Sequence, residues 1–168
     1  MKKKEKFYVF LDIDGVLWDW QWLKAEYTKG LKKQTIITVF NPNSISALNF
    51  LLATLEKNYD CQLVISSTWR YDMQKTNSTL RKNGLKYDKE LLATPTSTSP
   101  EKRSYEILDF LKGAKTKNLL IIDDESFDYS ANFSFKNIIK TNIANHSLNK
   151  QDVLNWLSRF QSNTRTLE

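Results

Sequence analysis

The sequence contains a single cysteine, Cys61, and a single histidine, His146. One cysteine excludes an intramolecular disulfide framework, and its apolar neighbours predict a buried, unreactive thiol. A cysteine-based phosphatase loop requires an arginine at the position that Ser67 occupies here, so that class of phosphatase is excluded. No nucleophile motif accompanies His146, which excludes a serine–histidine–aspartate triad and predicts a surface or helix-capping role.

Long hydrophobic runs are also absent: no apolar run approaches the roughly 20 residues of a membrane-spanning helix. The apolar run 7–11 follows several lysines, as in a signal peptide, but it is too short and ends in aspartates. We therefore expect a soluble, cytoplasmic protein without a classical signal peptide. No repeats or linkers divide the chain, which predicts one domain over residues 1–161. The polar residues 162–168 would form a tail that ends in a cloning remnant.

Acidic residues are fewer than basic ones, with 19 against 25, and the net charge is +6. This excess favours an anionic partner such as a phosphate ester, a nucleic acid or an acidic lipid. Lysines at the chain start supply much of it, so a solvated terminal tail is the alternative explanation.

The stretch 7–17 contains the strongest signal of chemistry. Apolar residues with high β propensity run from Phe7 to Leu11, which predicts a strand buried on both faces of a parallel sheet. Asp12 and Asp14 follow directly, and their spacing in an extended chain points both side chains to the same side. Gly15 then turns the chain. Ligands of such sheets bind where strands end, so this acidic pair is a candidate site.

Two further buried strands are predicted over 61–65 and 119–122, and a short one over 137–140. Ser66 and Ser67 follow the first of these, and Asp123 and Asp124 follow the second. At one edge of a parallel sheet the aspartates would repel one another, and a divalent cation would remove the conflict. Oxygen ligands without a histidine or cysteine cluster indicate Mg²⁺.

Helices are predicted between these strands. One begins at Asn41-Pro42 and turns apolar residues inward up to Leu55; another spans 71–89 with a break at Asn83-Gly84. A third is capped by Ser99 and ends at Gly113, and the last is capped by Asn149. The residues 91–99 are expected to be a loop. The inward residues expected for the last two helices are Tyr105, Ile107, Leu108, Leu111, Val153, Leu154, Trp156, Leu157 and Phe160.

Trp18, Trp20 and Trp22 alternate along the chain after the acidic pair, which predicts a hairpin or flap beside the site. These rings either pack on the domain or form an aromatic rim that binds substrate. Arg70 likewise either contacts substrate phosphate or pairs with a surface carboxylate.

Taken together, these motifs resemble the haloacid dehalogenase (HAD) superfamily of phosphohydrolases. Asp12-Ile13-Asp14-Gly15-Val16 looks like its first motif, and Ser66 or Ser67 like its second. Lys102 or Arg103 looks like the third, and Asp123-Asp124 with Asp128 like the fourth. More narrowly, Phe40-Asn41-Pro42, the run from Ile65 to Arg70, Arg103 ahead of Glu106-Ile107, and Asp123-Asp124 are similar to the HAD domains of Swiss Army Knife RNA-repair proteins.

The resemblance implies an α/β fold: a Rossmann-like three-layer sandwich with a mostly parallel central sheet and no large cap domain. It implies a phosphatase in which Asp12 is the nucleophile and Asp14 the general acid and base. Mg²⁺ would be held by the Asp12 carboxylate, the Asp14 carbonyl and Asp124, with Asp123 in support. Ser66 or Ser67, and Lys102 or Arg103, would bind the phosphate oxygens.

Between Trp18 and Phe40 there is room for a flap or a small helical segment, and between Arg70 and Ser99 for one helix and a loop, which is too little for a folded cap. We therefore expect an open site and a macromolecular substrate. We also expect a monomer. That substrate is either a phosphorylated nucleic-acid end or a phosphoprotein, such as one with phosphotyrosine. The alternatives are a phosphatase of small metabolites or nucleotides, and a catalytically silent module that binds phosphate and recruits a partner.

Overall fold

Strands and helices alternate along the chain in a computed structural model, which describes residues 3–33, 36–96, 103–112, 114, 118–125 and 129–164. A sheet of five strands, all parallel, has the order β3-β2-β1-β4-β5. The strands are β1 (Lys6–Leu11), β2 (Asp60–Ile65), β3 (Leu92–Ala93), β4 (Leu119–Asp123) and β5 (Ile138–Lys140). The expected α/β fold around a parallel sheet is therefore confirmed.

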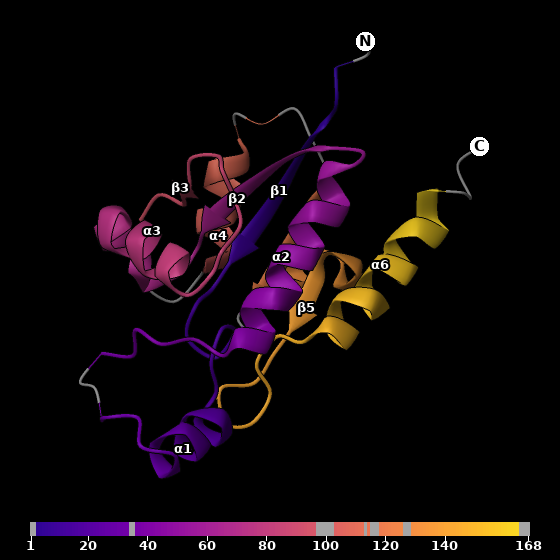
Figure 1. Ribbon diagram of the computed structural model, residues 1–168. Coiled ribbons are helices and arrows are strands. Elements are labelled where there is room, and N and C mark those ends of the chain that lie inside the picture. Colours follow the sequence, from indigo (N-terminus) through magenta and orange to yellow (C-terminus); the bar gives the residue numbers. More distant parts are fainter. Residues whose placement is uncertain are drawn as a thin grey trace.

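Helices cover both faces of this sheet, as Figure 1 shows. They are α1 (Trp20–Thr28), α2 (Pro42–Glu56), α3 (Met73–Lys82), α4 (Arg103–Leu111), α5 (Tyr129–Asn132) and α6 (Lys150–Thr164), with the short 3₁₀ helices η1 (Thr68–Asp72) and η2 (Phe135–Asn137). α2 and α6 pack on one face, whereas α4 and α5 pack on the other. The three-layer arrangement matches the expectation.

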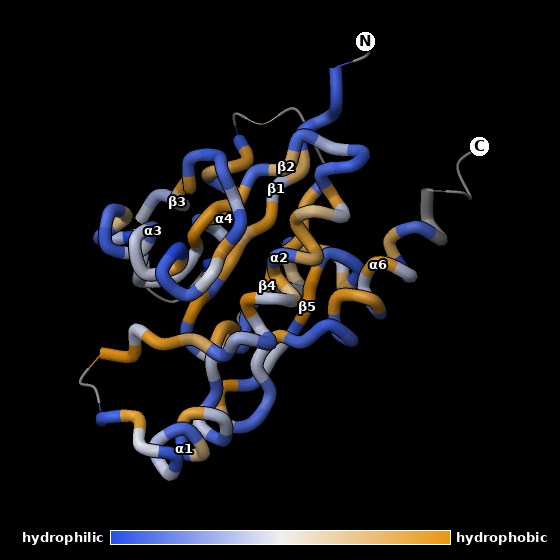
Figure 2. Tube along the Cα trace, in the orientation of Figure 1, coloured by the Kyte–Doolittle hydropathy of each residue, from blue (hydrophilic) through white to orange (hydrophobic). Residues whose placement is uncertain are grey.

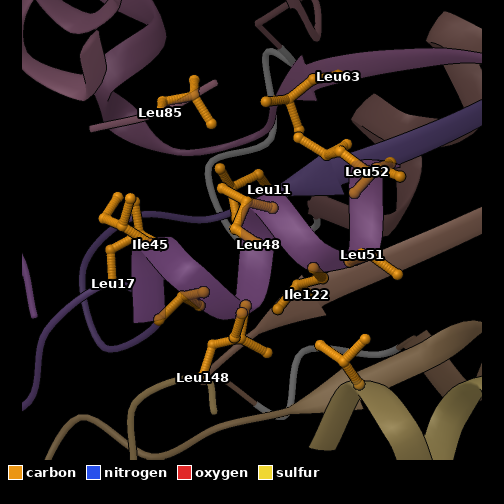
Figure 3. Close-up of a cluster of buried hydrophobic side chains, with 14 of the residues drawn as sticks. Leu11, Leu17, Ile45, Leu48, Leu51, Leu52, Leu63, Leu85, Ile122 and Leu148 are labelled. Atoms are coloured by element: carbon orange, nitrogen blue, oxygen red, sulfur yellow. The ribbon is translucent and has the colours of Figure 1, made fainter. Parts of the chain in front are cut away.

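The alternation of side chains along β1 explains the two cores. Phe7, Val9 and Leu11 belong to the core beneath α2, while Phe10 belongs to the core beneath α4. Figure 2 shows the resulting hydrophobic stretches in the strands. Figure 3 shows Leu48 and Leu51 of α2 against Leu11 and Ile122 of the sheet. Every inward residue predicted for this helix is buried: Ile45, Leu48, Leu51, Leu52 and Leu55.

The caps predicted at Asn41 and Asn149 and the prediction for the single cysteine also match the structure. The Asn41 side chain accepts a hydrogen bond from the Asn43 N–H, and the Asn149 side chain accepts one of 3.1 Å from the Asp152 N–H. Nε2 of His146 lies 3.1 Å from the Asp152 carboxylate in the first turn of α6. Burial raises the pKa of the Cys61 thiol to about 12, as expected for an unreactive cysteine.

Trp20 and Trp22 lie in α1, so the hairpin predicted from the alternating tryptophans is wrong, whereas the small helical segment expected as an alternative between Trp18 and Phe40 is present. Asp19 caps α1, since its side chain accepts a hydrogen bond of 2.8 Å from the Trp22 N–H. Trp18 lies ahead of the helix and is buried, while Trp20 projects into solvent. Alternate positions of a helix lie on different sides, so the aromatic spacing did not reflect a strand.

Other differences concern element boundaries. Of the helix expected over 71–89, residues 71–72 belong to η1 and residues 73–82 form α3, which begins after the Asp72 cap. Over the described residues 84–89, no helix follows the predicted break at Asn83-Gly84. The expected loop 91–99 contains the edge strand β3, and its residues 97–99 lie outside the described part, as do Pro100 and Gly113. Tyr105 and Leu154, expected inside, are 45% and 41% exposed. α6 continues past the domain end expected at residue 161.

The segments in which a cap could be housed contain α1, and then α3 with β3, among the described residues. Their buried side chains Leu23 and Leu80 belong to the main core. Within the described part, therefore, neither segment forms a cap with a core of its own. No described helix has the length and apolar character needed to cross a membrane.

Candidate active site

Polar side chains follow the central strands at one edge of the sheet. The Asp12 N–H donates to the Ile122 carbonyl and the Ser66 N–H donates to the Leu11 carbonyl, each with an N···O distance of 3.0 Å. These bonds continue the sheet by one residue beyond β1 and β2. They fix the backbone beneath Asp12 and Ser66, which brings the first and second motifs side by side.

Three carboxylates converge at this edge. Asp12, Asp123 and Asp124 each place an oxygen within 4.8 Å of the others. Burial raises the pKa of Asp12 to about 8, aided by the charges of Asp123 and Asp124 and opposed by Arg103 and a hydrogen bond from Ser67. Burial, and then the charge of Asp123, also raises the pKa of Asp124. The cluster is therefore electrostatically unfavourable without a cation.

Arg103, the first residue of α4, points into this cluster. Its Nη1 atom lies 3.1 Å from Asp12 Oδ1 and 2.9 Å from Asp123 Oδ2. Burial would lower the pKa of the guanidinium, but the charges of Asp12 and Asp123 outweigh burial and raise it. Of the two expected third-motif cations, Arg103 is thus at the site. Lys102 and Asp128 lie outside the described residues.

Asp123 is held on both oxygens. Its Oδ2 accepts hydrogen bonds from Arg103 and, at 2.7 Å, from the Tyr129 hydroxyl, while Oδ1 accepts one of 2.9 Å from the Glu125 N–H. Burial and the Asp123 charge raise the pKa of Tyr129, which keeps its proton available for this bond. Sequence reasoning missed Tyr129, because no spacing pattern links it to Asp123.

Two buried oxygens at the site have no hydrogen-bond partner among the described residues. They are the Ser66 hydroxyl oxygen and Asp12 Oδ1, which is nevertheless an ion-pair partner of the Arg103 guanidinium at 3.1 Å. Buried polar atoms are normally satisfied, so these two are suited to a ligand that the protein receives from outside. Ser67 differs, since it hydrogen-bonds the Asp12 side chain and caps η1.

The second aspartate of the pair, Asp14, is bound by two indole groups. Nε1 of Trp18 donates to Oδ1 of Asp14 at a distance of 3.0 Å, and Nε1 of Trp69 donates to Oδ2 of Asp14 at 3.1 Å. Trp69 was not singled out from the sequence, although it stands directly after the Ser-Ser-Thr run. Trp18 is 4% exposed, so the expectation that its ring binds substrate is corrected: it orients Asp14.

Trp20 and Arg70, the two other residues expected to contact substrate, differ in exposure: Trp20 faces solvent and Arg70 is buried. Trp20 is 54% exposed and packs edge-on against Trp18 at 5.1 Å between ring centroids. Arg70 faces inward: its Nη2 lies 2.8 Å from Oε1 of Glu106, and both side chains are 7% exposed. Its Nη1 donates to the carbonyls of Ser66 and Ser67. Arg70 therefore braces the second motif. It pairs with a carboxylate, as one alternative held, but that carboxylate is buried and not on the surface. A contact with substrate phosphate stays a prediction.

Gly15 allows the first and fourth motifs to approach. Its φ is +75°, and a Cβ atom built there would lie 2.4 Å from Cγ of Asp124. Only a residue without a side chain leaves room for that carboxylate.

Comparison with known proteins gives one family. The model for the HAD domain in Swiss Army Knife RNA repair proteins matches residues 8–153, a range that contains every motif described above. No curated protein and no solved structure shows significant similarity to the chain.

Proposed function

Because the chain belongs to the family of HAD domains in Swiss Army Knife RNA repair proteins, we propose that it is a Mg²⁺-dependent phosphatase of phosphomonoesters. The observation that carries this proposal is the convergence of Asp12, Asp123 and Asp124 around the Arg103 guanidinium at the sheet edge. The nucleophile, the ligands for a metal ion and an arginine that can bind phosphate are thereby available in one place.

The residues fit Mg²⁺. The cluster offers carboxylate oxygens without histidine or cysteine, which suits a hard cation, and Asp12 Oδ1 is buried without a hydrogen-bond partner among the described residues. Asp12, Asp124 and the Asp14 carbonyl would hold the ion, and Asp123 would support it. When bound, Mg²⁺ offsets the negative charge between the attacking carboxylate and the phosphate.

Asp12 acts as the nucleophile in this proposal. A carboxylate oxygen forms a bond to phosphorus as the ester P–O bond opposite it breaks, which leaves an aspartyl-phosphate and an alcohol. Water then attacks the phosphorus, the bond to Asp12 breaks, and phosphate leaves with Asp12 restored. The rigid backbone beneath Asp12 supports this role, since in-line attack depends on position.

Asp14 supplies and recovers the proton. It protonates the leaving alcohol oxygen in the first step and takes a proton from water in the second, so protons balance over the cycle. The indole groups of Trp18 and Trp69 fix the direction of its carboxylate. An orientation of this kind is what a general acid needs.

The phosphate oxygens would be bound by Arg103 and by a serine hydroxyl. The Ser66 oxygen has no hydrogen-bond partner in the described part of the chain, so its hydroxyl is available to donate to a phosphate oxygen. Ser67 already donates its one hydroxyl proton to Asp12 and would have to release that bond first. Lys102 stays a second candidate cation. Charge on these oxygens grows in the transition state, where such contacts have their largest effect.

We also propose a monomer with a single domain that acts on macromolecules. The described segments that could form a cap belong to the main core, which supports a site open to a large substrate. The family's description names RNA repair, which favours a phosphorylated nucleic-acid end over a phosphoprotein.

Hydrolysis of an aryl phosphate tests the proposal. We expect activity in Mg²⁺, none in chelator and none in Asp12→Asn, together with a covalent phosphate on the peptide that contains Asp12 of the wild-type protein. Asp88→Asn is the matched control, because this aspartate is exposed and lies in another part of the chain. Full activity in Asp12→Asn would refute the mechanism, and phosphate binding without turnover in the wild type would indicate the silent module.

A further inference from the structure

The outer side of α1 forms an exposed basic and aromatic surface, here called the α1 surface. Its hollow has a volume of about 560 Å³ and is lined by Trp20, Lys24, Tyr27, Thr28 and Lys33. Figure 1 shows α1 beyond the edge of the sheet at which β1 ends, the edge that carries the catalytic aspartates. A ligand on this surface is therefore on the same side of the molecule as the site.

Charge at the α1 surface is strongly one-sided. Residues 20–33 contain four lysines and one acidic residue, Glu26. Lys29 pairs with Glu26, whereas Lys24, Lys32 and Lys33 form no ion pair within the described part of the chain. Positive charge without a partner favours an anionic ligand.

Hydrogen bonds hold the α1 surface in place. The Trp20 N–H donates to the Ile143 carbonyl over 2.8 Å, and the Gln21 N–H donates to the Ala144 carbonyl over 3.1 Å. Asp19 caps the helix and also accepts a hydrogen bond from the Ser147 N–H. A ligand would thus meet a preformed platform, so little ordering would oppose binding.

A short chain of contacts joins this surface to the catalytic residues. Trp20 packs on Trp18, and Trp18 donates a hydrogen bond to Asp14. One aromatic ring thus separates the exposed face of Trp20 from the proposed general acid.

Exposed rings among unpaired lysines suit single-stranded nucleic acid. Bases stack on aromatic side chains regardless of sequence, and ammonium groups bind the phosphates between them. A second hollow, on the Trp69 side of the site, contains Lys75 but also Asp72, which offsets the lysine charge. The polyanion therefore belongs on α1.

We propose that the α1 surface binds the nucleotides next to the terminal phosphate of single-stranded RNA or DNA, with a base on Trp20 and phosphates on Lys24 and Lys33. This inference deepens the proposed function and depends on it for the direction of the strand. Binding itself does not depend on catalysis, so the two can be tested separately.

Fluorescence anisotropy with an unphosphorylated single-stranded oligonucleotide tests binding alone. Stacking contributes about 1–3 kcal/mol per base, so Trp20→Ala should raise Kd about tenfold or more. Lys24→Glu should raise Kd and lessen the dependence of affinity on salt. The matched controls are Phe135→Ala, whose aromatic side chain is 80% exposed, and Lys112→Glu, which changes net charge equally at the far end of α4 from Arg103. Both controls should bind like wild type.

Equal binding by the variants and their controls would overturn the proposal, because the effect would then be one of general charge. A phosphopeptide that competes for the α1 surface more strongly than the oligonucleotide would overturn it too. If the protein is active, kcat/KM for an end-phosphorylated oligonucleotide should fall about tenfold more in Trp20→Ala than kcat/KM for an aryl phosphate. An inactive protein that still binds the oligonucleotide through α1 would refute the phosphatase proposal and leave this one standing.

Discussion

Asp14 receives a hydrogen bond on each of its carboxylate oxygens, and both donors are indole N–H groups. Indole is a donor only, and one indole on each oxygen fixes the direction of the carboxylate. The residues come from separate segments, since Trp18 precedes α1 and Trp69 belongs to η1. At the scale of single residues, then, the proposed acid is positioned by tryptophans and not by other charged groups.

Trp69→Phe tests this positioning, because it keeps an aromatic ring against Phe40 and removes the donor. An alkyl phosphate needs a proton on its leaving oxygen, whereas a nitrophenyl phosphate barely does. We expect kcat/KM to fall about tenfold more for the alkyl ester than for the nitrophenyl ester. This is a part of the rate factor of roughly 10²–10⁴ that acid–base catalysis contributes. Trp156→Phe removes the indole bond to the Lys136 carbonyl elsewhere and is the control. Equal losses on both esters would show a merely structural role.

Gly15 provides a second test at this scale. Gly15→Ala forces a Cβ atom against the Asp124 carboxylate, so we expect Mg²⁺ affinity to fall at least about tenfold, a loss of about 1.4 kcal/mol. Gly30→Ala is the matched control: its φ is +107° and nothing lies within 4 Å of the added Cβ. Both variants should lose about 1–2 kcal/mol of stability from the left-handed backbone. Calorimetric titration with Mg²⁺ measures the difference, and equal affinities would contradict the proposed role of Asp124.

Among the elements, η1 and α4 are joined by the buried ion pair of Arg70 and Glu106. Arg70 also holds the carbonyls of Ser66 and Ser67, while Glu106 stands one helical turn after Arg103. The pair therefore relates the second motif to the third. The Arg70–Glu106 pair thus holds the serines of the second motif and Arg103 in fixed relative positions, although it contacts neither the serine hydroxyls nor the Arg103 guanidinium.

Arg70→Met should lower the free energy of unfolding by about 3–5 kcal/mol, because Glu106 is left as a buried charge. Lys112→Met breaks the exposed pair with Asp109 and should cost about 0.5 kcal/mol or less. Urea unfolding measures both. If the two substitutions cost the same, the Arg70 pair contributes no more than a surface contact, and its proposed bracing role fails.

For the whole molecule, the sheet edge collects negative charge while the chain as a whole is positive at +6. Folding brings Asp12, Asp123 and Asp124 together and takes them from water, which costs stability. The Arg103 guanidinium and hydrogen bonds from Ser67, Tyr129 and the Glu125 N–H offset part of this cost. The fold and the cation site are thus linked. Binding of Mg²⁺ to the folded chain should stabilise the whole domain.

Asp124→Asn separates these effects. Without Mg²⁺ the variant should have a higher Tm than wild type, because it removes one of the repelling carboxylates. With Mg²⁺ the wild type should gain more, because the variant has lost a proposed ligand. Asp88→Asn, at an exposed site, should respond to Mg²⁺ like wild type. Thermal unfolding in chelator and in Mg²⁺ decides the matter, and an unchanged wild-type Tm would argue against the cation site.

Local patterns were sufficient for the elements that bury apolar residues. The runs at β1, β2 and β4 could lie only in strands buried on both faces, and Asn41-Pro42 marked the start of α2. They were insufficient for α1, where the spacing of Trp18, Trp20 and Trp22 favoured a strand while the Asp19 cap, which decides the helix, was overlooked. β3 was not predicted, because an edge strand of two residues has almost no hydrophobic periodicity.

The sequence by itself determined that Asp12 and Asp123 end buried strands, because an apolar run followed by carboxylates has a local meaning. It also carried the order of motifs that defines the family. Only the tertiary structure decided that Arg103 bridges those two aspartates, that Trp69 holds Asp14, and that Arg70 turns inward to Glu106. These contacts join residues far apart in the chain. Each depends on which strands are neighbours and which face a helix covers, and no spacing along the sequence encodes that.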